Sequence, residues 1–269
     1  MSEQYMQDIF IPSKEYLHKK QDEREELIRI GRDITSYSKK AIFSLHRTFS
    51  ENNDKVKDLS ELVKHLQLLG TRLSQLKTIY DCNIALRGSV AGPVEELIEF
   101  FTFGHFVANR RLLEYKQFIT YIKILLNATT EPEPYQAILE SLFFNIDIPN
   151  KYESEVEVTF IDIGDYLMGL FDCTGEIMRS SIQHSSGFTG TLQLETTERQ
   201  YRYLQDLYQQ FTILTQKYPG ISIHRGVFDN ESRSKGNYSF MKKLEVFNNS
   251  IRKIETTLLD ILISDKETI

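Results

Sequence analysis

The segment that decides the fold is LIRIGRDITSYSKKAIFSLHRTF, residues 27–49. Its apolar and small residues recur every three or four positions and form one stripe: Leu27, Ile30, Ile34, Ser38, Ala41, Leu45 and Phe49. An α-helix has about 3.6 residues per turn, so this spacing places the whole stripe on one helical face. We therefore predict a long amphipathic helix that begins near Lys19 and turns this stripe toward a core.

The same period returns along most of the chain. Residues 59–80 carry leucines at helical spacing, namely Leu62, Leu66, Leu69, Leu73 and Leu76. Further helices are predicted for residues 94–113, 115–127, 135–144, 161–183, 195–217 and 238–263. Between them we expect connections at residues 50–54, 88–93, 129–134, 145–160, 184–191 and 219–236. Residues 155–160 alternate as a short strand would, but we favour a loop there.

These helices predict an all-α protein, a single-domain bundle of about seven helices. The chain has 269 residues, and its 13 glycines and 6 prolines are too few and too scattered to mark a linker between domains. We expect residues 1–18 to be a poorly ordered N-terminal tail and residues 19–265 to form the helical domain.

Composition excludes several classes of protein. The formal net charge is −6, so the overall field would not attract a nucleic acid, and RNA binding would need a local basic surface, a metal or a basic partner. No apolar run reaches the length of about 18 residues that a membrane span needs. The start of the chain does not resemble a secretory signal, and Cys82 and Cys173 are not spaced as a disulfide or zinc pair. We expect an intracellular protein.

Two of the predicted helices carry carboxylates among apolar neighbours. Glu96 and Glu99 lie three residues apart in VEELIEFF, which puts them on one helical face with their Cβ atoms about 5–6 Å apart. The helix at 161–183 carries an acidic stripe that ends in a cation: Asp165, Asp172, Glu176 and Arg179. Two carboxylates about 4 Å apart repel each other by roughly 4 kcal/mol at an effective dielectric constant near 20. Such groups therefore need a remedy.

Three remedies remain open at this point: exposure to solvent, an ion pair such as Glu176 with Arg179, or a bound cation. If a metal binds, an all-oxygen ligand set favours Mg²⁺ or Mn²⁺ over zinc or copper. His105 follows Glu99 by six residues and points away from the Glu face, so we expect a packed or capping histidine. The glycines do not have the spacing of a phosphate-binding loop.

Three blocks of the sequence resemble the translin/TRAX (translin-associated factor X) family, and the TRAX branch in particular. The first is RDIT followed by SKK, IF and LHR at residues 32–47. The second is Glu96-x-x-Glu99 followed by Phe103-x-His105-Phe106. The third is Asp165-Tyr166-Leu167-x-Gly169, then Asp172-x-Thr174-Gly175-Glu176-x-Met178-Arg179. The resemblance covers residues 27–263.

The resemblance implies a Mg²⁺-dependent endoribonuclease that cleaves single-stranded RNA and assembles with translin into a hollow hetero-octamer. By position, it makes Glu96, Glu99 and Asp172 the catalytic carboxylates and gives Glu99 and Glu176 the contacts to Mg²⁺, with Mn²⁺ as the alternative ion. The substrates it implies are passenger-strand fragments of RNA silencing or fragments from tRNA processing, with single-stranded DNA as a further ligand. The implied locations are the cytoplasm and the nucleus.

Candidate RNA contacts and rival functions complete the expectations. The candidate contacts are Arg87, Arg110, Arg111 and Arg179, and solvated surface is the alternative for each. A rival function is a non-catalytic subunit that stabilises translin and shapes its nucleic-acid binding. Another is an all-α nucleotide pyrophosphohydrolase, but the spacing from Asp172 to Glu176 is four residues where that class has three.

Overall fold

The computed structural model describes residues 2–49, 55–127, 131–152, 154–187, 191–217 and 230–267. The long helices are α2 (Ile11–Thr48), α3 (Lys55–Cys82), α4 (Arg87–Asn109), α5 (Tyr115–Asn127), α6 (Glu133–Phe144), α7 (Ile163–Gly187), α8 (Thr191–Lys217) and α9 (Asn230–Glu267). Shorter turns are α1 (Ser2–Tyr5), the π-helical η1 (Met6–Phe10), and the 3₁₀ segments η2 (Ile84–Leu86) and η3 (Asn150–Tyr152). The described residues contain helices and no strands, which confirms the predicted all-α class.

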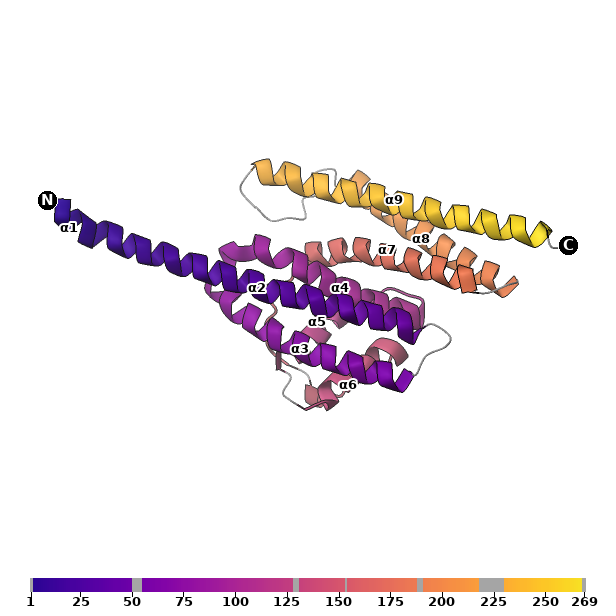
Figure 1. Ribbon diagram of the computed structural model, residues 1–269, viewed down its shortest axis with the longest axis horizontal. Helices are drawn as coiled ribbons and strands as arrows, with labels where there is room; N and C mark the ends of the chain where they lie inside the picture. Colours follow the sequence, from indigo (N-terminus) through magenta and orange to yellow (C-terminus); the bar gives the residue numbers. More distant parts are fainter. Residues whose placement is uncertain are drawn as a thin grey trace.

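The helix α4 is the centre of the bundle. It packs against α2 on one side and α7 on another, and α6 covers it from a third direction. The helices α3 and α5 lie beyond α2 and α4, whereas α8 and α9 cover α7 (Figure 1). The predicted stripe of α2 is buried against this centre, with Leu27, Ile34 and Leu45 fully enclosed.

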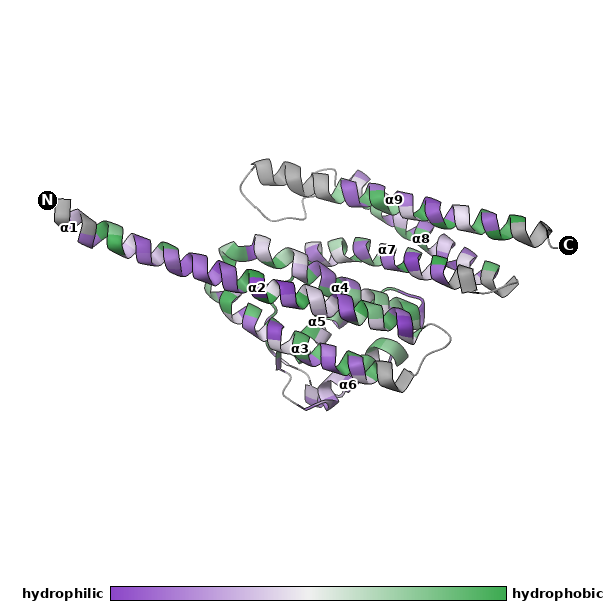
Figure 2. Cartoon of the chain, in the orientation of Figure 1, coloured by the Kyte–Doolittle hydropathy of each residue, from purple (hydrophilic) through white to green (hydrophobic). Residues whose placement is uncertain are grey.

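Residues 2–18 are helical in the structure and project beyond the bundle as the first part of a long rod (Figure 1). Most of this extension is hydrophilic (Figure 2). The first buried residue of α2 is Leu27. The helical form itself was not expected before about Lys19. That this tail is poorly ordered in solution stays a prediction.

The connection predicted for residues 88–93 is wrong, because α4 already begins at Arg87 and includes Pro93. Proline removes one backbone donor and is tolerated best near the start of a helix. Gly31 of α2 lies against the proline ring: a Cβ added there would stand 2.8 Å from Pro93 Cγ. The other end of α4 comes earlier than predicted, since Arg110 adopts a left-handed conformation (φ 59°) and caps the helix at Asn109.

Of the remaining connections, the one predicted at 145–160 is confirmed where it is described, whereas residues 133–134, 184–187, 191 and 230–236 are helical although they were predicted to lie in connections. Residues 145–149 and 154–162 form a loop that is interrupted by η3, and no strand occurs among them. The helix α7 continues to Gly187, so the polar segment at 184–191 is partly helical. The predicted turn at 50–54 and most of the predicted loop at 219–236 lie outside the described residues.

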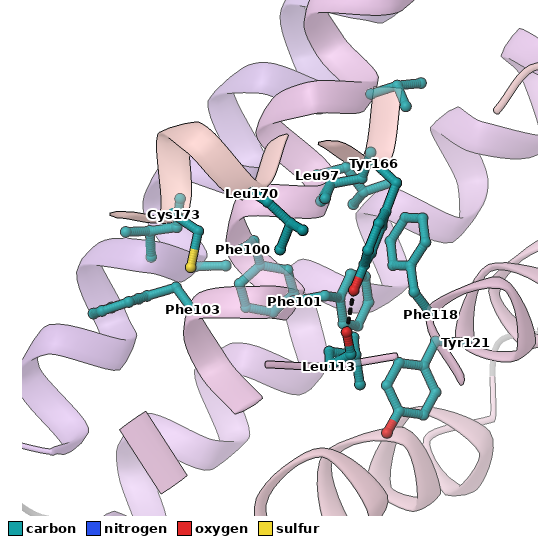
Figure 3. Packing of buried hydrophobic residues seen from close by; sticks show 14 of the residues in the cluster. Leu97, Phe100, Phe101, Phe103, Leu113, Phe118, Tyr121, Tyr166, Leu170 and Cys173 are labelled. Carbon is teal, nitrogen blue, oxygen red and sulfur yellow. Dashed lines mark hydrogen bonds between the residues drawn. The ribbon is translucent and has the colours of Figure 1, made fainter. Parts of the chain in front are cut away.

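The contact between α4 and α7 is very close. A Cβ added at Gly169 would lie 2.5 Å from Ile98 Cγ2 and 2.9 Å from the backbone oxygen of Glu95. Only a residue without a side chain allows the two helices to approach this closely. About one turn before Gly169 in α7, Tyr166 donates a hydrogen bond to the backbone oxygen of Leu113 within an aromatic core that includes Phe101 and Phe118 (Figure 3). These contacts fix the register of α7 on α4.

Within the described residues, no helix is both long enough and apolar enough to cross a membrane. Cys82 is exposed, Cys173 is buried, and both are free thiols.

Candidate functional site

A cavity with a volume of about 820 Å³ lies between α2, α4, α7 and α9. Its polar lining combines carboxylates and cations: Lys39, His46, Glu96, Glu99, Asp172, Glu176, Arg179, Lys242 and Lys243. Apolar residues of α2, α7 and α9 complete the wall. We call this cavity the carboxylate pocket.

The structure brings together the four carboxylates that the sequence marked on two separate helices. Glu96 and Glu99 come from α4, and Asp172 and Glu176 come from α7. The spacing on each helix puts both of its carboxylates on one face. The close approach at Gly169 then turns these two faces toward the same cavity.

Two lysines from distant parts of the chain neutralise part of this charge. Lys39 Nζ of α2 lies 3.0 Å from Glu96 Oε1. Lys243 Nζ of α9 donates hydrogen bonds to Asp172 Oδ2 at 2.8 Å, to Glu95 Oε2 at 2.9 Å and to the Met168 backbone oxygen at 3.1 Å. Burial alone would lower the pKa of Lys243, but Asp172 and Glu95 raise it above its ordinary value. Lys243 therefore stays charged and links α9 to α4 and α7.

Glu176 has two partners in the structure. Its Oε2 lies 2.7 Å from His46 Nε2, and its Oε1 lies 3.0 Å from Arg179 Nη1. The His46 ring packs on Phe103 with the ring centroids 4.7 Å apart, which fixes its orientation. The predicted pairing of Glu176 with Arg179 is thus confirmed, and His46 is an additional partner.

Glu99 differs from the other three carboxylates. It is only 9% exposed, and among the described residues no side chain forms a hydrogen bond or ion pair with its carboxylate. Burial, followed by repulsion from Asp172, Glu96 and Glu176, raises the pKa of Glu99 to about 8. Glu96 Oε2 is also buried and has no hydrogen-bond partner in the described part of the chain. Near pH 7 the Glu99 carboxyl group is therefore mostly protonated, and the pocket contains carboxyl oxygens that the described residues leave without a hydrogen-bond partner.

The carboxylate oxygens of the pocket are suitable ligands for a hard divalent cation. Carboxylate oxygens are the ligands that Mg²⁺ and Mn²⁺ prefer, and the two oxygens of Glu99 and Oε2 of Glu96 lack a hydrogen-bond partner among the described residues. The carboxylates line one cavity but do not form a preassembled metal site, because the described residues contain no group of three acidic, histidine or cysteine side chains close enough to hold a metal ion. Lys39 and Lys243 separate them. A cation would have to rearrange these ion pairs.

The four arginines proposed as RNA contacts lie in different places. Arg179 lines the carboxylate pocket and its side chain is 60% exposed. Arg110 and Arg111 follow the end of α4, roughly 16 Å along the helix axis from Glu99, and Arg111 bonds Asn145 Oδ1 at 2.9 Å.

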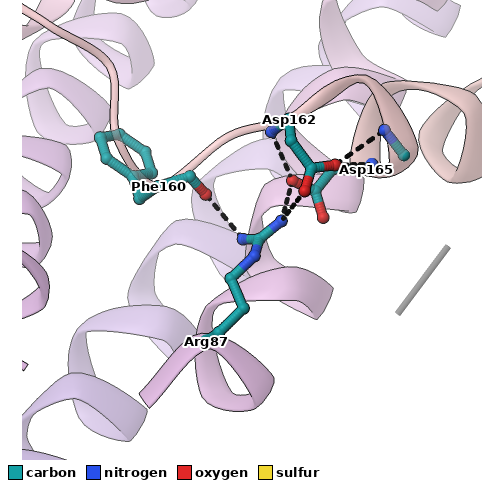
Figure 4. A network of polar contacts seen from close by, with 5 residues as sticks. Arg87, Phe160, Asp162 and Asp165 are labelled. Carbon is teal, nitrogen blue, oxygen red and sulfur yellow. Dashed lines mark hydrogen bonds and ion pairs between the residues drawn. The ribbon is translucent and has the colours of Figure 1, made fainter. Parts of the chain in front are cut away.

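Arg87 lies outside the pocket, in a separate network near the start of α7. It pairs with Asp165, lies 3.5 Å from Asp162 Oδ2, and donates a hydrogen bond to the Phe160 backbone oxygen at 2.7 Å (Figure 4). Asp162 Oδ1 accepts hydrogen bonds from the backbone nitrogens of Gly164 (2.7 Å) and Asp165 (3.1 Å) and so caps α7. Asp165 is therefore separated from Asp172 and Glu176, although the sequence put all three on one stripe.

Other predictions can be checked at the edge of the site. His105 is buried and its Nδ1 lies 3.1 Å from the Leu142 backbone oxygen, which confirms a packed histidine. The sequence did not single out Lys39, His46 or Lys243 as partners of the carboxylates. A signal for two of them was present, because Lys39 and His46 lie seven residues apart and so share one face of α2.

Comparisons with known proteins agree with this architecture. A model of the Translin family matches residues 22–265. The translin-associated protein X homolog of Schizosaccharomyces pombe is 27% identical over 93% of this chain and 85% of its own length. Translin-associated protein X of Rattus norvegicus is 24% identical over 93% of this chain and 76% of its own length.

Solved structures show the same fold. Apo-NeC3PO superimposes with a TM-score of 0.58 at 14% identity, covering 94% of this chain and 96% of its own. AfC3PO gives a TM-score of 0.52 at 18% identity, with 95% and 97% covered. The family match extends over nearly the whole helical bundle, including every carboxylate of the pocket. The chain belongs to the translin family.

Proposed function

We propose that this chain is the Mg²⁺-dependent endoribonuclease subunit of a hetero-oligomer with translin, and that it cleaves single-stranded RNA. The observation that carries the proposal is that the pocket-lining residues Glu99 and Glu96 have carboxyl oxygens without hydrogen-bond partners among the described residues. A buried carboxylate with a pKa near 8 and an unpartnered oxygen on Glu96 are costly features in a protein without a ligand for them. Perturbed groups of this kind gather at functional sites.

In this proposal, Glu99 and Glu176 hold the ion, and Glu96 and Asp172 face the scissile phosphodiester. Bound Mg²⁺ supplies Lewis-acid polarisation of the phosphate and activation of water. The Glu96 Oε2 atom is buried and has no hydrogen-bond partner among the described residues, so it could accept a proton from an attacking water once the side chain turns toward the cavity. Arg179 lies at the mouth of the pocket with an exposed side chain, where it can neutralise a phosphate of the incoming strand.

The translin partner accounts for the charge of the chain. Its formal net charge of −6 opposes binding to an RNA backbone, and a basic partner would supply the missing attraction. The family membership supports this assembly. We propose the cytoplasm and nucleus as its locations, and short RNA fragments of silencing or tRNA processing as its substrates, with single-stranded DNA as a further ligand.

One observation favours a second candidate, a non-catalytic subunit that stabilises translin. Glu96, Asp172 and Glu176 each have a cationic or histidine partner within the protein, and the described residues contain no preassembled metal group. A pocket that is held together by its own ion pairs can serve structure alone.

The deciding experiment is cleavage of an end-labelled single-stranded RNA by the chain co-expressed with translin, in Mg²⁺ or in EDTA. Glu99→Gln and Asp172→Asn should abolish Mg²⁺-dependent cleavage while the complex keeps its mass. Glu140→Gln removes an exposed carboxylate on α6, outside the pocket, and should leave cleavage unchanged. Cleavage retained in Glu99→Gln would reject the site, and an intact wild-type complex without cleavage would select the non-catalytic subunit.

A further inference from the structure

A second depression adjoins the carboxylate pocket on the other side of α2. It has a volume of about 370 Å³ and lies between α2 and α3. Its lining contains Lys39, Lys40, Phe43 and Arg47 of α2, together with Glu61 and His65 of α3. The function proposed above assigns no role to any of the α3 residues or to Phe43. We call this depression the basic subsite.

The two cavities share part of their walls. Lys39 and Phe43 line both, so the ridge of α2 that carries them separates one cavity from the other. Figure 1 shows α2 running between α3 on one side and α7 with α9 on the other. A flexible chain that occupies the carboxylate pocket can therefore continue over this ridge into the basic subsite.

The ridge presents an aromatic ring to the solvent. Phe43 is 63% exposed although it lies between the buried residues Ile42 and Ser44, near the C-terminal end of α2. The Arg47 guanidinium stands over this ring, 5.6 Å from its centroid. An exposed ring beside cations is the arrangement on which proteins stack the bases of single-stranded nucleic acids.

The charge of the basic subsite is opposite to that of the chain as a whole. It contains three cations, Lys39, Lys40 and Arg47, and one carboxylate, Glu61, which pairs with Arg47. The ring nitrogens of His65 are buried and have no hydrogen-bond partner among the described residues, and Nε2 lies 4.0 Å from Glu61 Oε1. Burial lowers the pKa of His65, so its imidazole is neutral near pH 7 and offers one donor and one acceptor.

We propose that the basic subsite binds single-stranded RNA, with one base stacked on Phe43 and the adjoining phosphates held by Lys40 and Arg47. The inference rests on the proposed function in one respect, that the same strand also occupies the carboxylate pocket. A double helix does not fit this role, because stacking on a side chain requires a base that is free of its neighbours. The subsite thus explains a preference for single strands by a contact outside the cleavage centre.

The test uses the complex with translin and a 5-iodouridine-containing single-stranded RNA in EDTA, so that no cleavage occurs. Photo-cross-linking attaches RNA to the chain it touches, and the two subunits are resolved by mass. Phe43→Ala should weaken binding to this chain by about 5- to 150-fold, the range expected when one base no longer stacks on an aromatic ring. Phe43→Trp should restore it. Phe144→Ala removes an equally exposed ring (66%) from α6 and should have no effect.

A second variant separates phosphate binding from stacking. Lys40→Gln should reduce the steepness of log affinity against log salt by about 0.7, because one cation fewer neutralises a phosphate of the single strand. Equal affinity of Phe43→Ala and Phe144→Ala would overturn the proposal. So would dissociation of translin from the Phe43→Ala complex, which would make this surface a protein interface.

The outcome is independent of catalysis. Phe43-dependent cross-linking by a complex that never cleaves RNA would reject the nuclease and leave the subsite standing. Mg²⁺-dependent cleavage and RNA affinity that are both normal in Phe43→Ala would reject the subsite and leave the nuclease standing.

Discussion

Two clusters of acidic and basic side chains lie along α7, and they are built in opposite ways. In the network of Arg87, Asp162 and Asp165, each carboxylate accepts bonds from backbone nitrogens as well as facing the guanidinium (Figure 4). In the carboxylate pocket, the carboxylates face a cavity, and Glu99 has no bonding partner among the described residues.

The difference separates a structural role from a functional one. Buried charges stabilise a fold only when their hydrogen bonds are satisfied, and the Arg87 network meets that condition. The carboxylate pocket leaves carboxyl oxygens of Glu99 and Glu96 without partners next to an open volume, so the fold is less stable there than it would be with satisfied polar groups. The comparison predicts that mutations in the first cluster act on stability, whereas mutations in the second act on ligand binding and catalysis.

The largest effect on stability is expected for Arg87→Met. Asp165 is almost fully buried, and burial already raises its pKa against the opposing effect of the guanidinium. Removing the cation leaves this carboxylate buried without its counter-charge, which costs about 3–5 kcal/mol. Thermal unfolding should show a fall in melting temperature of roughly 6–20 °C for a chain of this size.

The control for this variant is Arg202→Met, which breaks the exposed pair of Arg202 with Glu198 on α8. Exposed pairs contribute at most about 1 kcal/mol. Equal destabilisation of the two variants would contradict the structural role of the Arg87 network.

Glu99→Gln is expected to act in the opposite direction and to depend on pH. In the folded protein the pKa of Glu99 is about 8, above its ordinary value of 4.5, so folding favours the protonated form. Between these two values the unfolded chain loses its proton first, and the wild type should lose stability relative to Glu99→Gln by up to about 1.4 kcal/mol per pH unit. Below pH 4.5 the difference should vanish.

Urea denaturation of both proteins at several pH values, without divalent cations, measures this difference. If the free energies of unfolding of the two proteins change in parallel from pH 4.5 to pH 8, Glu99 is ionised and stabilised in the folded protein.

Gly169→Ala tests the contact that brings the two carboxylate pairs together. The added methyl group would collide with Ile98 and with the backbone oxygen of Glu95, so α7 must move away from α4. Such overpacking costs about 1–3 kcal/mol. Gly175→Ala is the matched control on the same helix, since a Cβ there meets no atom within 4 Å. Chemical denaturation should show destabilisation of the first variant and none of the second.

Residue patterns predicted the pocket only in part. The helical period and the carboxylates among apolar neighbours identified Glu96, Glu99, Asp172 and Glu176, because these features are local. The partners Lys39 and Lys243 come from the first and last long helices, and nothing local distinguishes them from ordinary surface lysines.

Arg87 was predicted to contact RNA but has a structural partner within the protein. As an isolated cation it was a plausible RNA contact, and only the packing of the start of α4 against the start of α7 reveals Asp165 as its partner. The start of α4 was also missed, since Gly92-Pro93 has the composition of a turn; in the structure both residues are helical, and the Pro93 ring lies against Gly31 of α2.

The smallest expected effect concerns the lysine that neutralises part of the carboxylate pocket. Lys243 forms an ion pair with Asp172. A divalent cation that binds the carboxylates of the pocket must therefore compete with Lys243. Lys243→Met should therefore raise the affinity for Mn²⁺ roughly tenfold, or about 1.4 kcal/mol. Lys242→Met removes the same charge from the neighbouring residue, which also lines the pocket but is exposed, and should change the affinity much less. Titration of Mn²⁺ followed by electron paramagnetic resonance measures both. Weaker binding of Mn²⁺ in Lys243→Met would mean that this lysine positions Asp172 for the ion. The ion pairs of the pocket would then have a structural role, as those of the Arg87 network do.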